Sequence, residues 1–248
     1  LDVIGVPVSA VGVVGQAGGA LAVRRRREGV SVAATKSSPV DVVTETDREV
    51  EAFIRARLAE LRPGDGFFGE ESDAAESRSG LTWVVDPIDG TVNFLYDIPA
   101  WAVSIGVVEG APDPATWTAI AGCVVNPVLG EVFTAVRGQG AFLGDERIQV
   151  SGATDLALSL VGTGFAYSAE TRRIQAAVVT DLIGQTRDVR RIGSAALDLC
   201  SVAAGRLDAY YERGLSPWDH AAGALIAAEA GARVSGLAGA PATRDFML

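Results

Sequence analysis

The sequence is poor in the residues that many catalytic schemes require. Its 248 residues include one histidine, one lysine and two cysteines. The lysine, Lys36, follows a threonine, whereas a Walker loop places its lysine after a glycine. There is no G-x-S-x-G segment, and Gly162-Thr163-Gly164 lacks the third glycine of a dinucleotide-binding loop. These absences argue against a P-loop NTPase, a serine hydrolase and a Rossmann oxidoreductase.

The number of cysteines and the net charge indicate the cellular location and exclude one class of partner. Cys123 and Cys200 are too few for a disulfide framework and lack the spacing of a zinc site, so we expect a reducing, cytoplasmic location. The chain carries 21 basic and 31 acidic residues, a net charge of −10 with histidine neutral. Because nucleic-acid phosphates are bound by clustered cations, we expect no nucleic-acid partner. Hydrophobic residues, at 48%, are sufficient for a large core.

The first segment has no charged residue from Val3 to Val23, and four arginines follow it. This length and this basic flank resemble a membrane span with a stop-transfer signal. However, five glycines and a proline interrupt the segment, and a secretory signal would place positive charge where Asp2 stands. We therefore expect a buried helix from about Ala10 to Glu28 and no membrane partner. The chain does not start with methionine, and we expect both of its ends to be incomplete.

Hydrophobic periodicity predicts the elements of the first 150 residues. A capping box formed by Thr46 and Glu49 opens a helix that stops at Pro63. Four apolar runs predict strands, at residues 81–85, 102–108, 119–125 and 131–136. Because short turns join the last three runs, we expect them to form an antiparallel meander.

Strands and helices alternate beyond Ser151. The expected strands lie near 159–162 and at 207–211, and the expected helices lie near 171–183, at 194–204 and at 219–230. Alternation of this kind indicates a sheet sandwiched between helices. We therefore expect one compact unit with an N-terminal α+β part at 1–150 and a C-terminal α/β part at 151–248.

Two pairs of acids stand where predicted elements end. Glu70 and Glu71 lie on a turn after a glycine, and 16 residues after Glu70 an apolar strand ends at Asp86, close to Asp89. A strand delivers such a carboxylate to the edge of its sheet, where pockets form. Carboxylate and carbonyl oxygens are the ligands that Mg²⁺ prefers. A lone D-x-x-D-G segment is more often a solvated surface turn, but the two pairs together favour a metal site.

Two further features suit a metal site that binds phosphate. The backbone amides of Gly90 and Thr91 follow Asp89 on a tight turn and can accept a phosphate group. Asp219 stands in the first turn of an apolar helix. An acid at that place also complements the helix dipole, and this simpler interpretation would be preferred without the other motifs.

Three segments together resemble the signatures of the inositol monophosphatase family. They are Gly69-Glu70-Glu71-Ser72, Trp83-Val84-Val85-Asp86-Pro87-Ile88-Asp89-Gly90-Thr91-Val92-Asn93-Phe94 and Trp218-Asp219-His220-Ala221-Ala222-Gly223. Residues 36–47 match the family's N-terminal block, and the resemblance runs from about Ala17 to Gly239. It implies an α/β (α+β) fold, a layered αβαβα sandwich that is usually a homodimer. It also implies Mg²⁺-dependent hydrolysis of phosphate monoesters, often inhibited by Li⁺.

The resemblance implies a site for two or three Mg²⁺ ions. One ion is assigned to Glu70, Asp86 and the backbone carbonyl of Ile88. A second is assigned to Asp86, Asp89 and Asp219, and a third, weaker ion to the neighbourhood of Glu70. The N-terminal part would thus carry most metal ligands, and the C-terminal part the last one.

The resemblance also assigns catalytic and substrate-binding residues. Thr91, hydrogen-bonded to Asp47, would orient the attacking water beside Glu70, with Glu71 as an acid farther out. The substrate contacts would be Gly90, Thr91, Gly193, Ser194, Ala195 and Glu212.

Four other side chains near these positions have less defined roles. Arg213 and His220 occupy positions that vary across the family and could tune the alcohol that is recognised. Arg190 and Arg191 could reach a substrate, but capping a strand is the favoured interpretation.

We expect the substrate to be inositol 1-phosphate, hydrolysed to inositol and phosphate by a metal-activated water. Histidinol phosphate, fructose 1,6-bisphosphate and adenosine bisphosphate stay open, because relatives with the same acidic motifs accept them. From another class, the chain could be a regulatory binding protein that keeps the fold and engages the transcription machinery.

Overall fold

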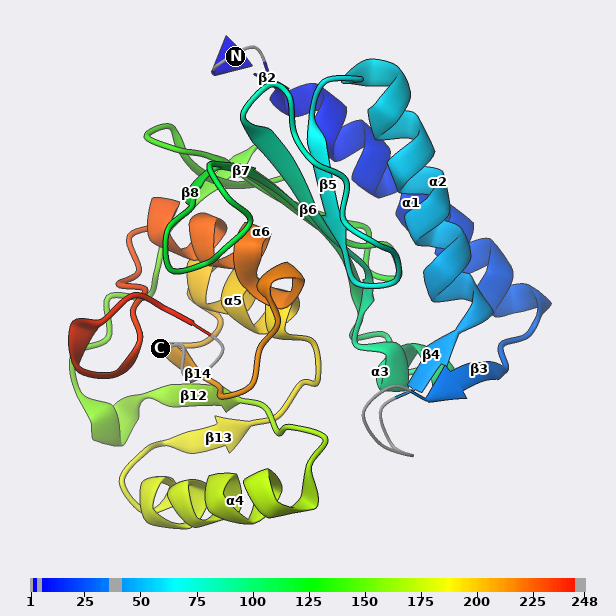
Figure 1. Ribbon diagram of the computed structural model, residues 1–248. Coiled ribbons are helices and arrows are strands. Elements are labelled where there is room, and N and C mark those ends of the chain that lie inside the picture. The colour runs from blue at the N-terminus through cyan, green and yellow to red at the C-terminus, as the bar shows by residue number, and fades with distance from the viewer. Residues whose placement is uncertain (1, 4–5, 36–41, 244–248) are drawn as a thin grey trace.

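Helices and sheets alternate in layers through the molecule (Figure 1). The computed structural model describes residues 2–3, 6–35 and 42–243. Helices α1 (Val8–Glu28) and α2 (Glu45–Leu61) cover one face of a seven-stranded sheet, and α5 (Ala195–Ala203) and α6 (Pro217–Glu229) cover the other. A three-stranded sheet comes next, with α4 (Ala169–Ile183) outside it. The expected layered αβαβα sandwich is confirmed.

The larger sheet is a meander with one parallel strand at its edge. Its strands, in sheet order, are β11 (Glu146–Ile148), β10 (Gly140–Leu143), β9 (Glu131–Val136), β8 (Thr118–Asn126), β7 (Ala102–Glu109), β6 (Leu81–Asp89) and β5 (Gly66–Gly69). Only β5 and β6 run parallel to each other. The predicted antiparallel meander is confirmed, and it continues through β10 and β11.

Side chains of β8 alternate between the two faces of this sheet. Cys123 and Val125 pack in the core that includes residues of α1 and α2, and Val124 packs with α5 and α6. A strand covered by helices on both faces needs apolar side chains in both directions.

Helix α1 occupies the uncharged N-terminal segment. Val11 and Val14 are buried in the core that it shares with α2, and Arg25 in its last turn pairs with Glu49 of α2 at 2.5 Å. The predicted helix is confirmed, with a start slightly earlier than Ala10. Of the helices in the described ranges, none has the length and apolar character that crossing a membrane would need.

The start of α2 differs from the prediction. Its N-cap is Thr44, whose hydroxyl accepts from the Asp47 amide, while Asp47 Oδ2 accepts from the Thr44 amide at 2.9 Å. The predicted capping box of Thr46 and Glu49 is wrong. The helix begins two residues earlier, and the Glu49 carboxylate is bound to Arg25 instead.

Small residues let α6 approach the larger sheet closely. Gly106 of β7 and Gly122 of β8 are paired neighbours. A Cβ on Gly106 would lie 2.9 Å from Ala221 Cβ, and one on Gly122 would lie 3.0 Å from Ala222 Cα. This close contact fixes the N-terminal half of α6 and therefore the position of Asp219.

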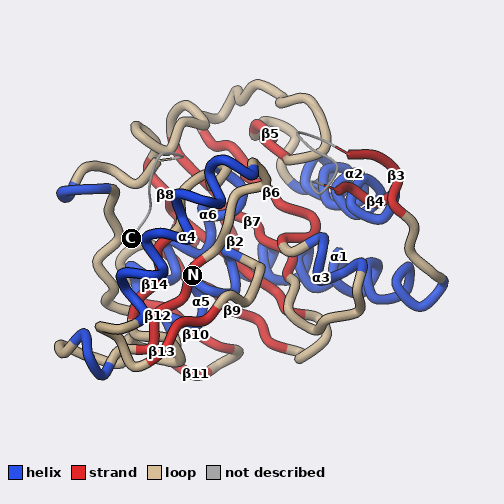
Figure 2. The backbone as a smooth tube through the Cα atoms, turned by 90° about the horizontal axis from the view of Figure 1, so that it is seen from below, coloured by secondary structure: helices blue, strands red, loops and turns tan. Residues whose placement is uncertain are grey.

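The smaller sheet is parallel, in the order β13 (Asp188–Arg190), β12 (Leu160–Thr163) and β14 (Ala209–Tyr211). Its strands are connected through α4 and α5, as parallel pairing requires. The predicted alternation beyond residue 151 is confirmed, and β13 is an additional strand. Further short elements are β1 (Asp2–Val3), β2 (Val6–Pro7), β3 (Val32–Thr35), β4 (Val42–Thr44) and α3 (Thr91–Leu95). Figure 2 shows the β3 and β4 pair beside α2.

Candidate functional site

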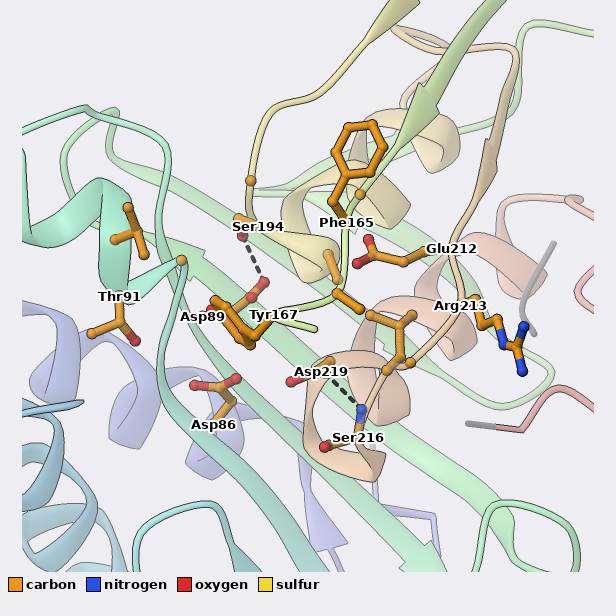
Figure 3. A pocket seen from close by; sticks show the side chains of 18 of the residues that line it. Asp86, Asp89, Thr91, Phe165, Tyr167, Ser194, Glu212, Arg213, Ser216 and Asp219 are labelled. Carbon is orange, nitrogen blue, oxygen red and sulfur yellow. Dashed lines mark hydrogen bonds between the residues drawn. The ribbon is translucent and has the colours of Figure 1, made fainter. Parts of the chain in front are cut away.

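One pocket gathers nearly all the residues that the sequence singles out. It lies where the end of β6 faces the loops before α4, α5 and α6 (Figure 3). Its volume is about 750 Å³. Its wall includes Glu70, Asp86, Ile88, Asp89, Gly90, Thr91, Gly193, Ser194, Ala195, Glu212 and Asp219. Asp47 is outside the wall and reaches it through Thr91.

The end of β6 presents two of the acids. The strand is buried throughout, and its pairing with β7 slips between Asp86 and Asp89. Such a bulge redirects the side chains at the end of a strand. Asp86 Oδ1 accepts from the Ile88 amide at 3.0 Å, and Gly90 follows with a φ of +95°. A Cβ on Gly90 would lie 3.0 Å from the Ala100 carbonyl oxygen, so the turn requires glycine.

Groups at the starts of α5 and α6 bind two of the acids, Asp89 and Asp219. Asp89 Oδ2 accepts from the Ser194 hydroxyl at 2.6 Å and from the Ala196 amide at 2.7 Å. Asp219 Oδ2 accepts from the Ser216 amide at 2.7 Å. Segments more than a hundred residues apart therefore meet at this pocket.

Carboxylates of the pocket are buried from solvent and repel one another. Burial raises the pKa of Asp219 well above its usual range, and the carboxylates of Asp89 and Glu70 raise it further. Burial also raises the pKa of Asp89. Figure 3 shows Asp219 pointing toward Asp86. A cation bound among these carboxylates would relieve the repulsion.

Four acidic residues, Glu70, Asp86, Asp89 and Asp219, line this side of the pocket together with Ile88, whose backbone carbonyl is a further hard oxygen ligand. This chemistry fits Mg²⁺. Within the ranges that the structure describes, however, no three histidine, cysteine or acidic side chains stand close enough to enclose an ion. The acids share one pocket but do not converge on one point. One carboxylate oxygen of each of Asp86, Asp89 and Asp219 accepts a hydrogen bond from another group of the protein.

Asp47 supports Thr91 from behind the pocket. The Thr91 hydroxyl lies 3.1 Å from Asp47 Oδ1 and 3.1 Å from the Ile88 carbonyl oxygen, and its single proton can go to one of them at a time. Asp47 is completely buried, and its Oδ2 accepts from the amide and the hydroxyl of Thr44. Burial raises the pKa of Asp47 to about 6. Because both of its oxygens are bound, Asp47 restricts the orientation of Thr91.

Glu212 occupies the wall opposite the β6 turn, just after β14. The Tyr210 hydroxyl donates to its Oε2 at 2.6 Å. A Cβ on Gly164 would overlap the Glu212 carboxylate, so this side chain depends on a glycine across from it. Burial raises the pKa of Glu212 to about 7.

Asp198 of α5 is a buried acid that the sequence reasoning missed. Burial raises its pKa to about 8, and the charges of Glu212 and Asp89 add to the effect. Its Oδ1 has no hydrogen-bond partner among the residues that the structure describes. It is the only charged residue in the segment AALDLCSVA, and that isolation was the available signal.

The two adjacent arginines have different surroundings. Arg190 lies on β13 and pairs with Asp188 at 2.6 Å, as a strand-capping role predicts. Arg191 follows the end of β13 and lines the pocket, so a strand-capping role stays a prediction for it. Its guanidinium lies close to Gly193, where Nη1 would be 2.6 Å from an added Cβ.

Arg213 and His220 also differ from each other. Arg213 lines the pocket, and Figure 3 shows its guanidinium pointing away from the acids. His220 is buried outside the pocket wall, with its ring 5.8 Å from that of Trp117. Of the two, only Arg213 can meet a bound substrate directly.

Three comparisons relate the chain to known proteins. The model of the inositol monophosphatase family matches residues 6–247. Inositol-1-monophosphatase SuhB of Mycobacterium tuberculosis is 51% identical over 221 residues, 86% of this chain and 74% of that protein. Nus factor SuhB of Pasteurella multocida is 43% identical over 204 residues, 81% of this chain and 73% of that protein. The crystal structure of extragenic suppressor protein suhB from Bartonella henselae matches with a TM-score of 0.86 and 34% identity, over 96% of this chain and 92% of that chain. The chain therefore belongs to the inositol monophosphatase family.

Proposed function

We propose that the protein is a Mg²⁺-dependent phosphatase that hydrolyses inositol 1-phosphate to inositol and phosphate. The observation that carries the proposal is the pocket in which four acidic residues and Ile88 lie beside the Gly90 turn. Membership in a family of phosphoric monoester hydrolases supports the reaction type. The name of the M. tuberculosis relative, inositol-1-monophosphatase, supports the substrate.

Two or three Mg²⁺ ions are the proposed cofactors. The residues that would hold them are Glu70, Asp86, Ile88 through its carbonyl, Asp89 and Asp219. Bound Mg²⁺ neutralises phosphate charge, acidifies the attacking water and stabilises the leaving alkoxide. The contribution of the chain is a set of oxygen donors delivered from rigid elements. Asp86 would contact both main ions, so a substitution at this position should impair metal binding most.

Thr91, Asp47 and Glu70 are the proposed catalytic residues. When Asp47 accepts the proton of the Thr91 hydroxyl, the lone pairs of Thr91 Oγ can accept a proton of the attacking water. Glu70 lines the same pocket and would hold the water from another direction. The amides of Gly90 and Thr91 would bind the phosphate oxygens, which fixes the phosphorus for in-line attack.

The loop before α5 and Glu212 are the proposed contacts for the alcohol. Gly193, Ser194 and Ala195 line the pocket beside Asp89. Glu212 Oε2 is occupied by the Tyr210 hydroxyl, which leaves Oε1 to accept from a ring hydroxyl of the substrate.

We further propose a homodimer in the cytoplasm that Li⁺ inhibits and that has no nucleic-acid or membrane partner. The net charge of −10 supports the absence of nucleic-acid contact. The assembly can be measured by sedimentation, where a dimer is expected and a monomer would contradict the proposal.

Glu212→Gln is expected to raise KM for inositol 1-phosphate about tenfold, because it removes a charged acceptor for a substrate hydroxyl. Hydrolysis of phenyl phosphate, which has no ring hydroxyl, should change by less than about twofold. Glu170→Gln is the matched control, since Glu170 lines the same pocket but is exposed. Steady-state kinetics on both esters measure the effect. An equal loss of kcat/KM on both would show that Glu212 does not select the substrate.

A substrate panel tests the proposed ester itself. Inositol 1-phosphate should give the highest kcat/KM among inositol 1-phosphate, histidinol phosphate, fructose 1,6-bisphosphate and adenosine bisphosphate. A higher value for any of the other three would replace inositol 1-phosphate as the substrate.

A regulatory binding role is the second candidate, favoured by the name of the Pasteurella relative, Nus factor SuhB. A pull-down and a phosphatase assay separate the two functions. Near-stoichiometric recovery of RNA polymerase, together with no turnover of any ester, would show that the regulatory binding role is the function. Turnover without such recovery would leave catalysis as the function.

A further inference from the structure

Helix α2 carries three polar side chains one turn apart, Asp47, Glu51 and Arg55. This row runs beside the buried apolar row of Val50 and Ile54, so it faces the protein and not the solvent at its start. Asp47 reaches Thr91 of the β6 turn. The other two reach the second acidic segment of the pocket, residues 69–73.

The Glu51 side chain binds the backbone of residues 69–73. Its side chain is 1% exposed, and its Oε2 accepts from the Glu71 amide at 2.8 Å. A Cβ on Gly69 would overlap the Glu51 carboxylate, so the glycine before Glu70 gives this side chain its space. The contacts of Glu51 therefore flank Glu70 on both sides.

Arg55 holds the far end of the same segment. Its Nη1 donates to the Ser72 hydroxyl at 2.7 Å and to the Asp73 carbonyl at 2.8 Å. Its guanidinium also lies over the ring of Phe67, 5.0 Å from the centroid. On the opposite side, the Glu70 amide donates to the Val85 carbonyl of β6 at 3.2 Å. The backbone of Glu70 is thus fixed between β6 and α2.

We propose that Glu51, assisted by Arg55, is a positioning residue that sets the affinity of the pocket for its cation by holding Glu70 in place. This inference rests on the proposed function, in which Glu70 is a metal ligand. Glu51 lies outside the pocket wall and acts through the loop backbone. Helix α2 then positions both acidic segments, Thr91 through Asp47 and Glu70 through Glu51.

The physical consequence concerns binding more than the chemical step. Without the Glu51 carboxylate, the Glu71 amide loses its buried acceptor, and the 69–73 loop can take several positions. Groups that orient metal ligands typically contribute tenfold to a hundredfold in metal affinity. Saturating Mg²⁺ can select the correct loop position again, so the maximal rate should fall much less than the affinity.

Calorimetric titration of the metal-free chain with Mg²⁺ tests the proposal. Glu51→Ala is expected to weaken Mg²⁺ binding at least about tenfold, and Glu51→Gln, which keeps an acceptor oxygen, less than about threefold. Glu49→Ala is the matched control, because Glu49 lies on the same helix and pairs with Arg25 away from the pocket. It should bind Mg²⁺ like the wild type. In phosphatase assays, the half-saturating Mg²⁺ concentration should rise for Glu51→Ala while kcat at saturation stays within about threefold.

The outcomes separate the inference from the function on which it rests. Wild-type affinity in folded Glu51→Ala, or an equal loss in Glu49→Ala, overturns the positioning role alone. A wild-type chain that binds no Mg²⁺ overturns the proposed function and the inference with it. If Glu51→Ala does not fold, Ser72→Ala decides, since Ser72 is an exposed loop residue that Arg55 contacts. It should bind Mg²⁺ about threefold more weakly, and unchanged binding would overturn the proposal.

Discussion

Asp86→Asn is expected to lower kcat/KM for inositol 1-phosphate about a thousandfold, or about 4 kcal/mol of transition-state stabilisation. Asp86 is 2% exposed at the end of β6 and is the acid that both main ions would share. An amide has the same shape but lacks the charge that a divalent cation requires. Phosphate release at saturating Mg²⁺ measures the effect.

The fold should survive this substitution. Asp86 Oδ1 accepts a hydrogen bond from the Ile88 amide at 3.0 Å, and an asparagine oxygen can accept the same bond. Removing one of several crowded negative charges should leave the metal-free chain at least as stable in thermal unfolding. Asp113→Asn, in an exposed turn, is the control and should keep full activity. Activity of Asp86→Asn above about a tenth of the wild-type value would contradict the metal assignment.

Gly122→Val is expected to lower the free energy of unfolding by about 3 kcal/mol, because it overpacks the contact between β8 and α6. A Cβ at this position would already lie 3.0 Å from the Cα and the carbonyl oxygen of Ala222, and backbone atoms cannot rotate away. Because Asp219 lies one turn before Ala222, displacement of α6 should also weaken Mg²⁺ binding. Urea unfolding and calorimetry measure the two effects.

Gly12→Ala is the control for Gly122→Val. Gly12 lies on α1, and in the described part of the chain no atom outside the backbone of that helix lies within 4 Å of its Cβ position, so alanine should be neutral or stabilise by up to about 1 kcal/mol. Wild-type stability of Gly122→Val would show that α6 can move outward freely. In that case the glycine pair would not determine the position of Asp219.

Local patterns account for the part of the fold that could be predicted. The meander from β6 to β9 follows from apolar runs joined by short turns, and α2 follows from its periodic apolar residues. Strand β5 has four residues, Gly66–Gly69, too few for a periodic signal. The start of α2 was mistaken because two Thr-x-x-acid segments overlap there, and only the fold shows that Glu49 is bound to Arg25.

In the candidate site, too, local sequence patterns predict some of the positions, and the long-range contacts lie beyond them. Asp86 and Asp89 are three residues apart in sequence, so their common position could be expected from the apolar strand that leads into them. The hydrogen bond from Ser194 to Asp89 spans 105 residues, and no local pattern predicts such a contact. Glu51 stands one turn after Asp47, a visible spacing, but nothing local tells which loop that helix face meets.

The most direct test of the central claim is phosphate release from inositol 1-phosphate by chelator-treated protein while Mg²⁺ is added back. The acidic pocket predicts no release above background without metal and full recovery as Mg²⁺ saturates the protein. Release at the original rate in the presence of chelator would contradict a metal-dependent phosphatase.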